Sequence, residues 1–132
     1  MVTPVFRIFD YSKAIGFDVG WLGFHLDWED RPATGPDYLQ VSRGDVVLHL
    51  SGHPGDSPPG AKARAEIRGL PAYHRLLLGR EHPHVKPALV AAVWNERVLE
   101  MEVTDPFGNR LIFCEPVGLL WGSEQVRISR RR

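Results

Sequence analysis

A few side chains in this 132-residue sequence are of the types that bind small molecules or metal ions. His49 carries an imidazole, which can ligate a metal or hydrogen-bond to a ligand. Glu100 and Glu102 lie two positions apart in an otherwise apolar segment, where carboxylates could hold a basic ligand. Tyr38 and Trp94 offer rings that could stack on a planar molecule. These residue types predict a ligand site if the fold brings them to one face.

Each of these residues also has a purely structural interpretation. His49 could be a polar residue satisfied by a neighbour such as Glu102, since a buried polar group needs a partner in either case. The glutamates could form a solvated strand face, and Trp94 could fill an interface or the core. Trp28 shares a predicted strand face with two apolar residues, so we interpret it as core. Cys114 has no base beside it in the sequence, and we predict no catalytic residue.

The clearest element is a hairpin over residues 97–104 and 109–115. Apolar and polar residues alternate through Leu99–Thr104, the period of a strand with one buried and one open face. The turn DPFGN at 105–109 suits Asp, Pro and Gly at successive turn positions. The open face of this hairpin is predicted to carry the two glutamates on one strand and Ile112 on the other.

The same patterns predict the remaining elements. Strands are expected at residues 3–9, 24–29, 38–42, 46–51, 62–68 and 88–93, and helices from residue 10 or 12 to 22 and from 71 to 78. The run GHPGDSPPG at 52–60 has too many breakers to be an element and reads as a linker.

The two halves therefore repeat one order of elements, strand, helix and three strands. We predict an α+β fold of two βαβββ modules, at about residues 3–53 and 62–115, which form a curved mixed sheet with helices on its outer face. We expect one domain over residues 1–118 and a C-terminal tail over 119–132. Ten residues are predicted to pack between sheet and helices: Phe6, Ile8, Val41, Leu48, Leu50, Ile67, Met101, Val103, Leu111 and Phe113.

Composition narrows the functional classes. Sixteen Lys and Arg balance sixteen Asp and Glu, so no overall field favours nucleic acid or a membrane surface. A single cysteine allows no internal disulfide and suits a reducing compartment. No apolar run is long enough to span a bilayer. We therefore expect a cytoplasmic protein that binds neither nucleic acid nor membrane.

Several short motifs, in this order, resemble the vicinal oxygen chelate superfamily, which includes glyoxalase I, extradiol dioxygenases and the fosfomycin and bleomycin resistance proteins. The motifs are DYSKA at 10–14 with LGF at 22–24, RGDVVLHL at 43–50 and DPFGN at 105–109. The segments DWE at 27–29 and LHLSGH at 48–53 look most like the small bleomycin resistance-like, glyoxalase-like proteins. The resemblance covers nearly the whole chain and implies the doubled βαβββ fold.

The resemblance also implies where a catalytic metal would sit. Enzymes of the superfamily hold a divalent ion with ligands from the first, fourth, fifth and eighth strands. Those places fall on or near Thr3, His49, Arg64 and Ile112 here, and of these His49 alone can ligate a metal. The resemblance therefore implies the branch without a metal or other cofactor. We expect its ligand to contact Tyr38, His49, Trp94, Glu100, Glu102 and Ile112.

Within that branch, the bleomycin resistance proteins enclose a cationic antibiotic between two subunits. The resemblance thus implies a homodimer that confers antibiotic resistance by sequestering bleomycin-type glycopeptides. The alternative is a metal-dependent enzyme of the same superfamily, a lyase or dioxygenase, that uses His49 and Glu102.

Overall fold

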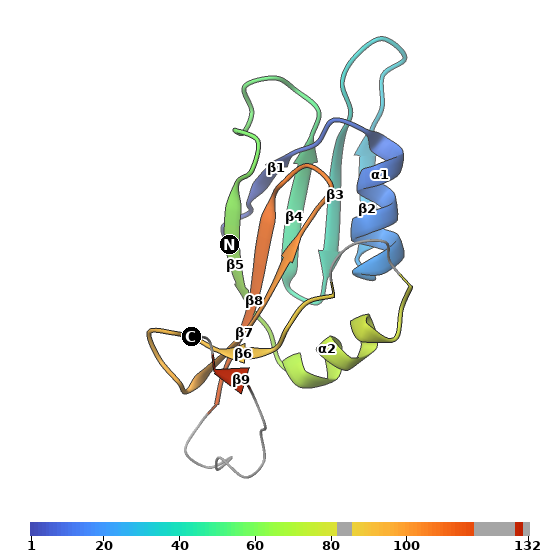
Figure 1. The fold of residues 1–132 in the computed structure, drawn as a ribbon. Helices are drawn as coiled ribbons and strands as arrows, with labels where there is room; N and C mark the ends of the chain where they lie inside the picture. The colour runs from blue at the N-terminus through green and yellow to red at the C-terminus, as the bar shows by residue number, and fades with distance from the viewer. Residues whose placement is uncertain (82–85, 118–128, 131–132) are drawn as a thin grey trace. The chain divides into compact units, whose positions relative to one another are not determined.

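The computed structural model describes residues 1–81, 86–117 and 129–130 (Figure 1). The chain forms two compact units. The first contains Met1–Ala63 and the turn segment Thr104–Arg110, and the second contains Arg64–Val103 and Leu111–Arg132. No helix among the described residues is long and apolar enough to cross a membrane.

The first unit is built on a four-stranded mixed sheet with the strand order β1-β4-β3-β2. The strands are β1 (Val5–Arg7), β2 (His25–Asp30), β3 (Tyr38–Arg43) and β4 (Val46–Ser51). Only β1 runs parallel to its neighbour β4, while the other two pairs are antiparallel. The alternating residues Leu39, Val41, Leu48 and Leu50 are buried, so their polar neighbours occupy the opposite face of the sheet.

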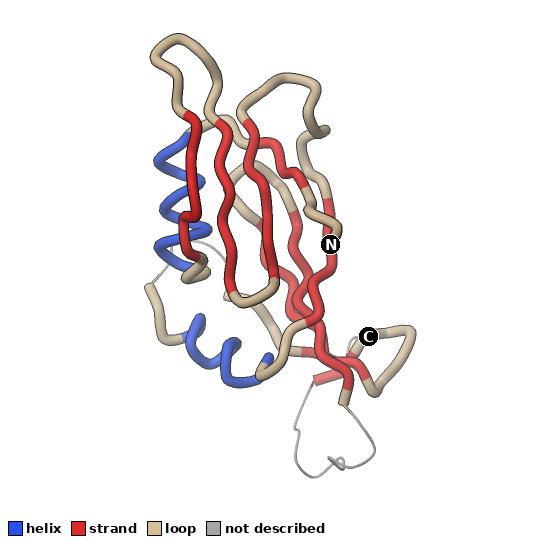
Figure 2. Tube along the Cα trace, turned by 180° about the vertical axis from the view of Figure 1, so that it is seen from behind, coloured by secondary structure: helices blue, strands red, loops and turns tan. Residues whose placement is uncertain are grey.

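The helix of this unit begins as α1 (Tyr11–Ile15) and continues as η1 (Gly16–Trp21), a wider π-helical turn. The Asp10 carboxylate caps it by accepting from the Lys13 backbone N–H at 2.9 Å. The helix lies alongside β2 in both views (Figures 1 and 2). Ala14, Phe17 and Trp21 are buried along it, which adds them to the core of the unit. The predicted helix from residue 10 or 12 to 22 is confirmed.

The second unit has a five-stranded sheet with the order β5-β8-β7-β6-β9. Its strands are β5 (Lys62–Glu66), β6 (Val90–Ala91), β7 (Val98–Thr104), β8 (Arg110–Pro116) and β9 (Ser129–Arg130). The first four follow the same order as β1-β4-β3-β2, so the two βαβββ modules of an α+β fold are confirmed. The strand β9 pairs in parallel with β6, where the sequence predicted only a tail. The rest of that predicted tail, residues 119–128 and 131–132, lies outside the described residues.

The helix α2 (Leu70–Leu78) follows β5 in the second unit. Gly69 precedes it with φ 74°, a conformation that glycine adopts without strain. The Glu115 carboxylate accepts from the backbone N–H groups of Gly69 and Leu70 at 2.9 and 3.0 Å. The Tyr73 ring packs edge-on against Phe113 in the core.

The predicted hairpin and core are confirmed, but the hairpin's open face is not. All ten predicted core residues are buried. The turn is held by the Asp105 carboxylate, which accepts from the backbone N–H groups of Phe107 and Asn109. Glu100 and Ile112, however, are also buried, so a solvated face for Glu100 was wrong. Central strands such as β7 and β8 are covered on both faces, which alternation alone does not reveal.

Candidate functional site

A cluster of polar and aromatic side chains lies on the open face of the first sheet. Strands β3 and β4 pair Gln40 directly with His49. The His49 ring lies between two partners: its Nδ1 is 2.7 Å from the Tyr38 hydroxyl and its Nε2 is 3.0 Å from the Gln40 Oε1. The predicted neighbour Glu102 is therefore not what satisfies this imidazole. The two site residues that the sequence placed on this face, Tyr38 and His49, touch each other.

Trp28 completes the cluster, and its interpretation as a core residue was wrong. A register shift between Leu26 and Trp28 inserts Asp27 as an extra residue in β2. Such a bulge reverses the faces that follow it. The Trp28 ring consequently stacks on Tyr38, with centroids 6.0 Å apart and planes 10° apart, and meets His49 edge-on. It is 44% exposed, so part of the ring is open to a ligand.

Asp27, the extra residue, is the end of a hydrogen-bond chain on this face. Its carboxylate accepts from Gln40 Nε2 at 3.0 Å and from Ser42 Oγ at 3.0 Å, and it lies 2.9 Å from His25 Nδ1. These hydrogen bonds, first that from Gln40 and then those from His25 and Ser42, lower the pKa of Asp27 to about 2. The carboxylate is therefore ionised at neutral pH.

The cluster offers a ring platform and hydrogen-bonding groups but no ready metal site. Both ring nitrogens of His49 already have protein partners. Across residues 1–81, 86–117 and 129–130, no three His, Cys, Asp or Glu side chains are grouped so that they could hold a metal ion. The arrangement suits non-covalent binding of a planar molecule.

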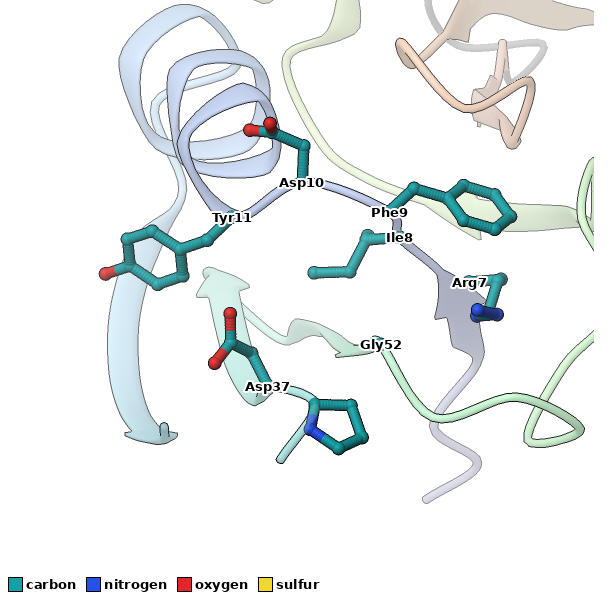
Figure 3. Close-up of a pocket in the computed structure, with 8 residues that line it drawn as sticks. Arg7, Ile8, Phe9, Asp10, Tyr11, Asp37 and Gly52 are labelled. Carbon is teal, nitrogen blue, oxygen red and sulfur yellow. The ribbon is translucent and has the colours of Figure 1, made fainter. Parts of the chain in front are cut away.

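A pocket of about 220 Å³ opens at one end of the same unit, where β1 meets α1 (Figure 3). No sequence pattern indicates this pocket, because its walls come from three separate segments. Asp37 is one of two carboxylates in the wall, and it pairs with the Arg31 guanidinium at 3.4 Å. That guanidinium in turn covers the ring of Tyr11. The lining residues are Arg7, Ile8, Phe9, Asp10, Tyr11, Pro36, Asp37 and Gly52.

The other predicted site residues belong to the second unit. Glu100, only 3% exposed, forms an ion pair with Arg64, whose Nη1 is 2.6 Å from the Glu100 Oε2. The same guanidinium lies 5.4 Å from the centroid of the Trp94 ring, which is 65% exposed. Glu102 is half-buried and Ile112 is buried. Of this set, the Trp94 ring is the most open to a ligand.

A comparison with protein-family models shows the family of this chain. A family model described as "Glyoxalase superfamily protein" matches residues 1–118. No curated protein matches the chain.

Solved structures with the same fold include three antibiotic-binding or resistance proteins. A bleomycin-binding protein complexed with bleomycin is 22% identical, with a TM-score of 0.66 over 87% of this chain and 97% of that one. A bleomycin resistance determinant encoded on the transposon Tn5 is 22% identical, with a TM-score of 0.65 over 88% and 97%. TnmS3, an antibiotic binding protein from Streptomyces sp. CB03234, is 23% identical, with a TM-score of 0.58 over 86% and 93%. At these identities the likeness shows the shared fold.

Proposed function

Because the chain belongs to the glyoxalase superfamily, also called the vicinal oxygen chelate superfamily, we propose that it is a small-molecule binding protein of the antibiotic-sequestering kind. The proposed ligand class is the bleomycin-type glycopeptide. Three structural relatives carry antibiotic binding or resistance in their names, which supports this choice over other ligands.

The observation that carries the proposal is the cluster of Trp28, Tyr38 and His49. A partly exposed tryptophan stacked on a tyrosine gives an apolar surface for a planar group, and the polar atoms beside it can orient that group. Both ring nitrogens of His49 are hydrogen-bonded to other side chains, so the imidazole holds the neighbouring residues of this surface in place. In the second unit, Trp94 offers a further ring and Glu102 a carboxylate for a cationic ligand.

We further propose that the protein acts in the cytoplasm as a homodimer. The single cysteine is buried and is compatible with a reducing compartment. Each unit exposes large apolar side chains that a second copy could cover, such as Phe9 in the first unit and Val93 in the second.

Titration calorimetry with metal-free and copper-bound bleomycin tests the proposal. We expect submicromolar affinity that Trp28→Ala weakens by about 1–3 kcal/mol, since a desolvated aromatic contact is lost. Trp94→Ala and Glu102→Gln should weaken binding in the same direction. Leu76→Ala is a matched control because Leu76, on α2, is 46% exposed and belongs to none of the proposed contacts. No binding at about 100 μM would rule out sequestration, because the affinity would then be weaker than about −5.5 kcal/mol.

Metal analysis of protein purified without a histidine tag separates this proposal from the metal-dependent lyase or dioxygenase. We expect no stoichiometric divalent ion, because a metal at His49 would have to displace Tyr38 or Gln40 from the ring nitrogens. One zinc, nickel, manganese or iron per chain that disappears in His49→Ala would instead favour the enzyme.

A further inference from the structure

We infer that the hydrogen-bond chain from Asp27 to Tyr38 determines which aromatic ligands the Trp28 face accepts. This series of hydrogen bonds makes the Tyr38 hydroxyl oxygen a hydrogen-bond acceptor toward the ligand. The surface formed by Trp28 and Tyr38 therefore binds a planar molecule that has an N–H or ammonium donor beside its ring. This inference rests on the proposed function, because it specifies the ligand chemistry of the same site.

The series of hydrogen bonds starts from the Asp27 carboxylate, which can only accept a hydrogen bond. An ionised carboxylate has no proton to donate, so the Gln40 side chain must present its amide nitrogen to Asp27, as the 3.0 Å contact from Nε2 to Oδ2 shows. A side-chain amide has its oxygen on the other branch. The Gln40 Oε1 is therefore directed at His49, 3.0 Å from its Nε2.

The amide oxygen then fixes the tautomer of the imidazole. A carbonyl oxygen needs a donor, so Nε2 of His49 carries the hydrogen. A neutral imidazole has a single N–H, which leaves Nδ1 as an acceptor. Nδ1 lies 2.7 Å from the Tyr38 oxygen, and so the tyrosine hydroxyl donates its proton to His49.

The tautomer of His49 determines how Tyr38, the residue proposed to contact the ligand, uses its hydroxyl group. Its one proton is used inward, while its oxygen keeps a lone pair for an outside donor. Burial, together with the negative charge of Asp56, raises the pKa of Tyr38, so the hydroxyl keeps this proton at neutral pH. The Trp28 ring stacked beside it supplies the apolar surface for the ligand's ring. A ring that offers only acceptor atoms would place two acceptors against each other.

Two measurements at about pH 8 test this without knowledge of the natural ligand. Long-range ¹H–¹⁵N NMR reads the tautomer of His49, and we expect the Nε2–H form. Titration with indole and with benzofuran compares two rings of nearly equal shape, of which indole has an N–H where benzofuran has an ether oxygen. We expect indole to bind about threefold to tenfold more tightly, the effect of one hydrogen bond.

Three variants test whether the preference for indole over benzofuran depends on the hydrogen bonds from Asp27 to Tyr38. Tyr38→Phe keeps a ring for stacking and should abolish the preference for indole. Asp27→Asn replaces the pure acceptor by an amide, so Gln40 can turn over and His49 should show both tautomers, with a smaller preference for indole. Asp27 is a positioning residue, and the NMR signature is the readout that a simple loss of stability would not produce. Tyr11→Phe is the control, because the Tyr11 hydroxyl donates to Glu29 in the same unit.

Several results would overturn the inference. They are an Nδ1–H tautomer in the wild-type protein, equal affinity for indole and benzofuran, or an Asp27→Asn variant with an unchanged His49 spectrum. If neither probe binds, the ligand class is also wrong. The bleomycin titration then distinguishes the two failures: binding of bleomycin would leave the proposed function standing, and its absence would remove both.

Discussion

Asp18 is a carboxylic acid inside the core of the first unit. It lies on η1 and is only 4% exposed. Burial raises the pKa of Asp18 well above its ordinary value of 3.8, and the negative charge of Asp105 adds to the rise. The folded state therefore favours the protonated acid more strongly than the unfolded state does. Protonation of Asp18 therefore stabilises the folded state. This stabilisation is complete below the pKa of Asp18 in the unfolded chain and is lost as the pH rises through its pKa in the folded protein.

The variant Asp18→Asn should be more stable than the wild type at pH 8, by about 1 kcal/mol or more, because the amide has no charge to bury. The advantage should shrink toward pH 4, where the wild-type carboxyl is protonated. Urea unfolding at several pH values measures it. Asp45→Asn, at an exposed position, is the control and should leave the pH profile unchanged. Parallel profiles for Asp18→Asn and the wild type would contradict this prediction.

At the level of single residues, sequence alternation placed Tyr38 and His49, but not Trp28, on the face of the first sheet where all three side chains lie. Strands β3 and β4 pair without a shift, so alternation correctly placed the first two on the open face. The alternation of apolar residues also runs unbroken into Trp28, and it gives no sign that Asp27 is an extra residue. A bulge is decided by pairing with the neighbouring strand, which a single strand's pattern does not contain. The three side chains consequently meet in a way that the sequence did not predict.

Among the elements, α2 depends most visibly on a residue far away in the chain. Its preceding residue is Gly69, which has no side chain to cap the helix. The buried Glu115 on β8 supplies the acceptor for two backbone N–H groups instead. A carboxylate at this end also interacts favourably with the helix dipole.

Glu115→Ala should reduce the free energy of unfolding by about 1–3 kcal/mol, since it removes the acceptor of two backbone N–H groups, of which that of Leu70 is buried. Glu115→Gln, which keeps one acceptor oxygen but no charge, should lose less. Urea unfolding monitored by circular dichroism measures both. Glu66→Ala, an exposed glutamate on β5, is the matched control. A loss of less than about 0.5 kcal/mol in Glu115→Ala would show that other groups satisfy the helix.

The element order was predictable, and the partners of charged residues were not. Alternation and turn residues indicated the hairpin, both helices and the strands β1 to β8, because these signals lie within a few neighbouring positions. The ion pair of Glu100 joins it to Arg64, 36 positions away, so a segment read alone suggested a solvated glutamate. Strand β9 contains Ser129–Arg130, two polar residues without an apolar pattern, and only its pairing with β6 defines it.

At the scale of the whole molecule, the proposed assembly can be tested directly. Sedimentation equilibrium at about 10 μM should give twice the 14.9 kDa chain mass, because the exposed apolar side chains favour association. Bleomycin, if it binds between two copies, should shift the equilibrium further toward the dimer. A mass of one chain at this concentration, with and without bleomycin, would contradict the homodimer.

Because Asn109 lies late in the sequence, the first unit cannot complete its hydrogen bonding early in synthesis. Its side-chain amide donates to the backbone carbonyl of Arg7, 102 positions earlier, and its Oδ1 accepts from the backbone N–H of Ala61. The unit therefore lacks part of its hydrogen bonding until residue 109 has left the ribosome. The stretch from Ala63 to Arg110 takes roughly 2–10 s to translate at about 5–20 residues per second. During that interval the nascent first unit cannot form the hydrogen bonds of the Asn109 side chain. These bonds become possible only after most of the second unit has been synthesised.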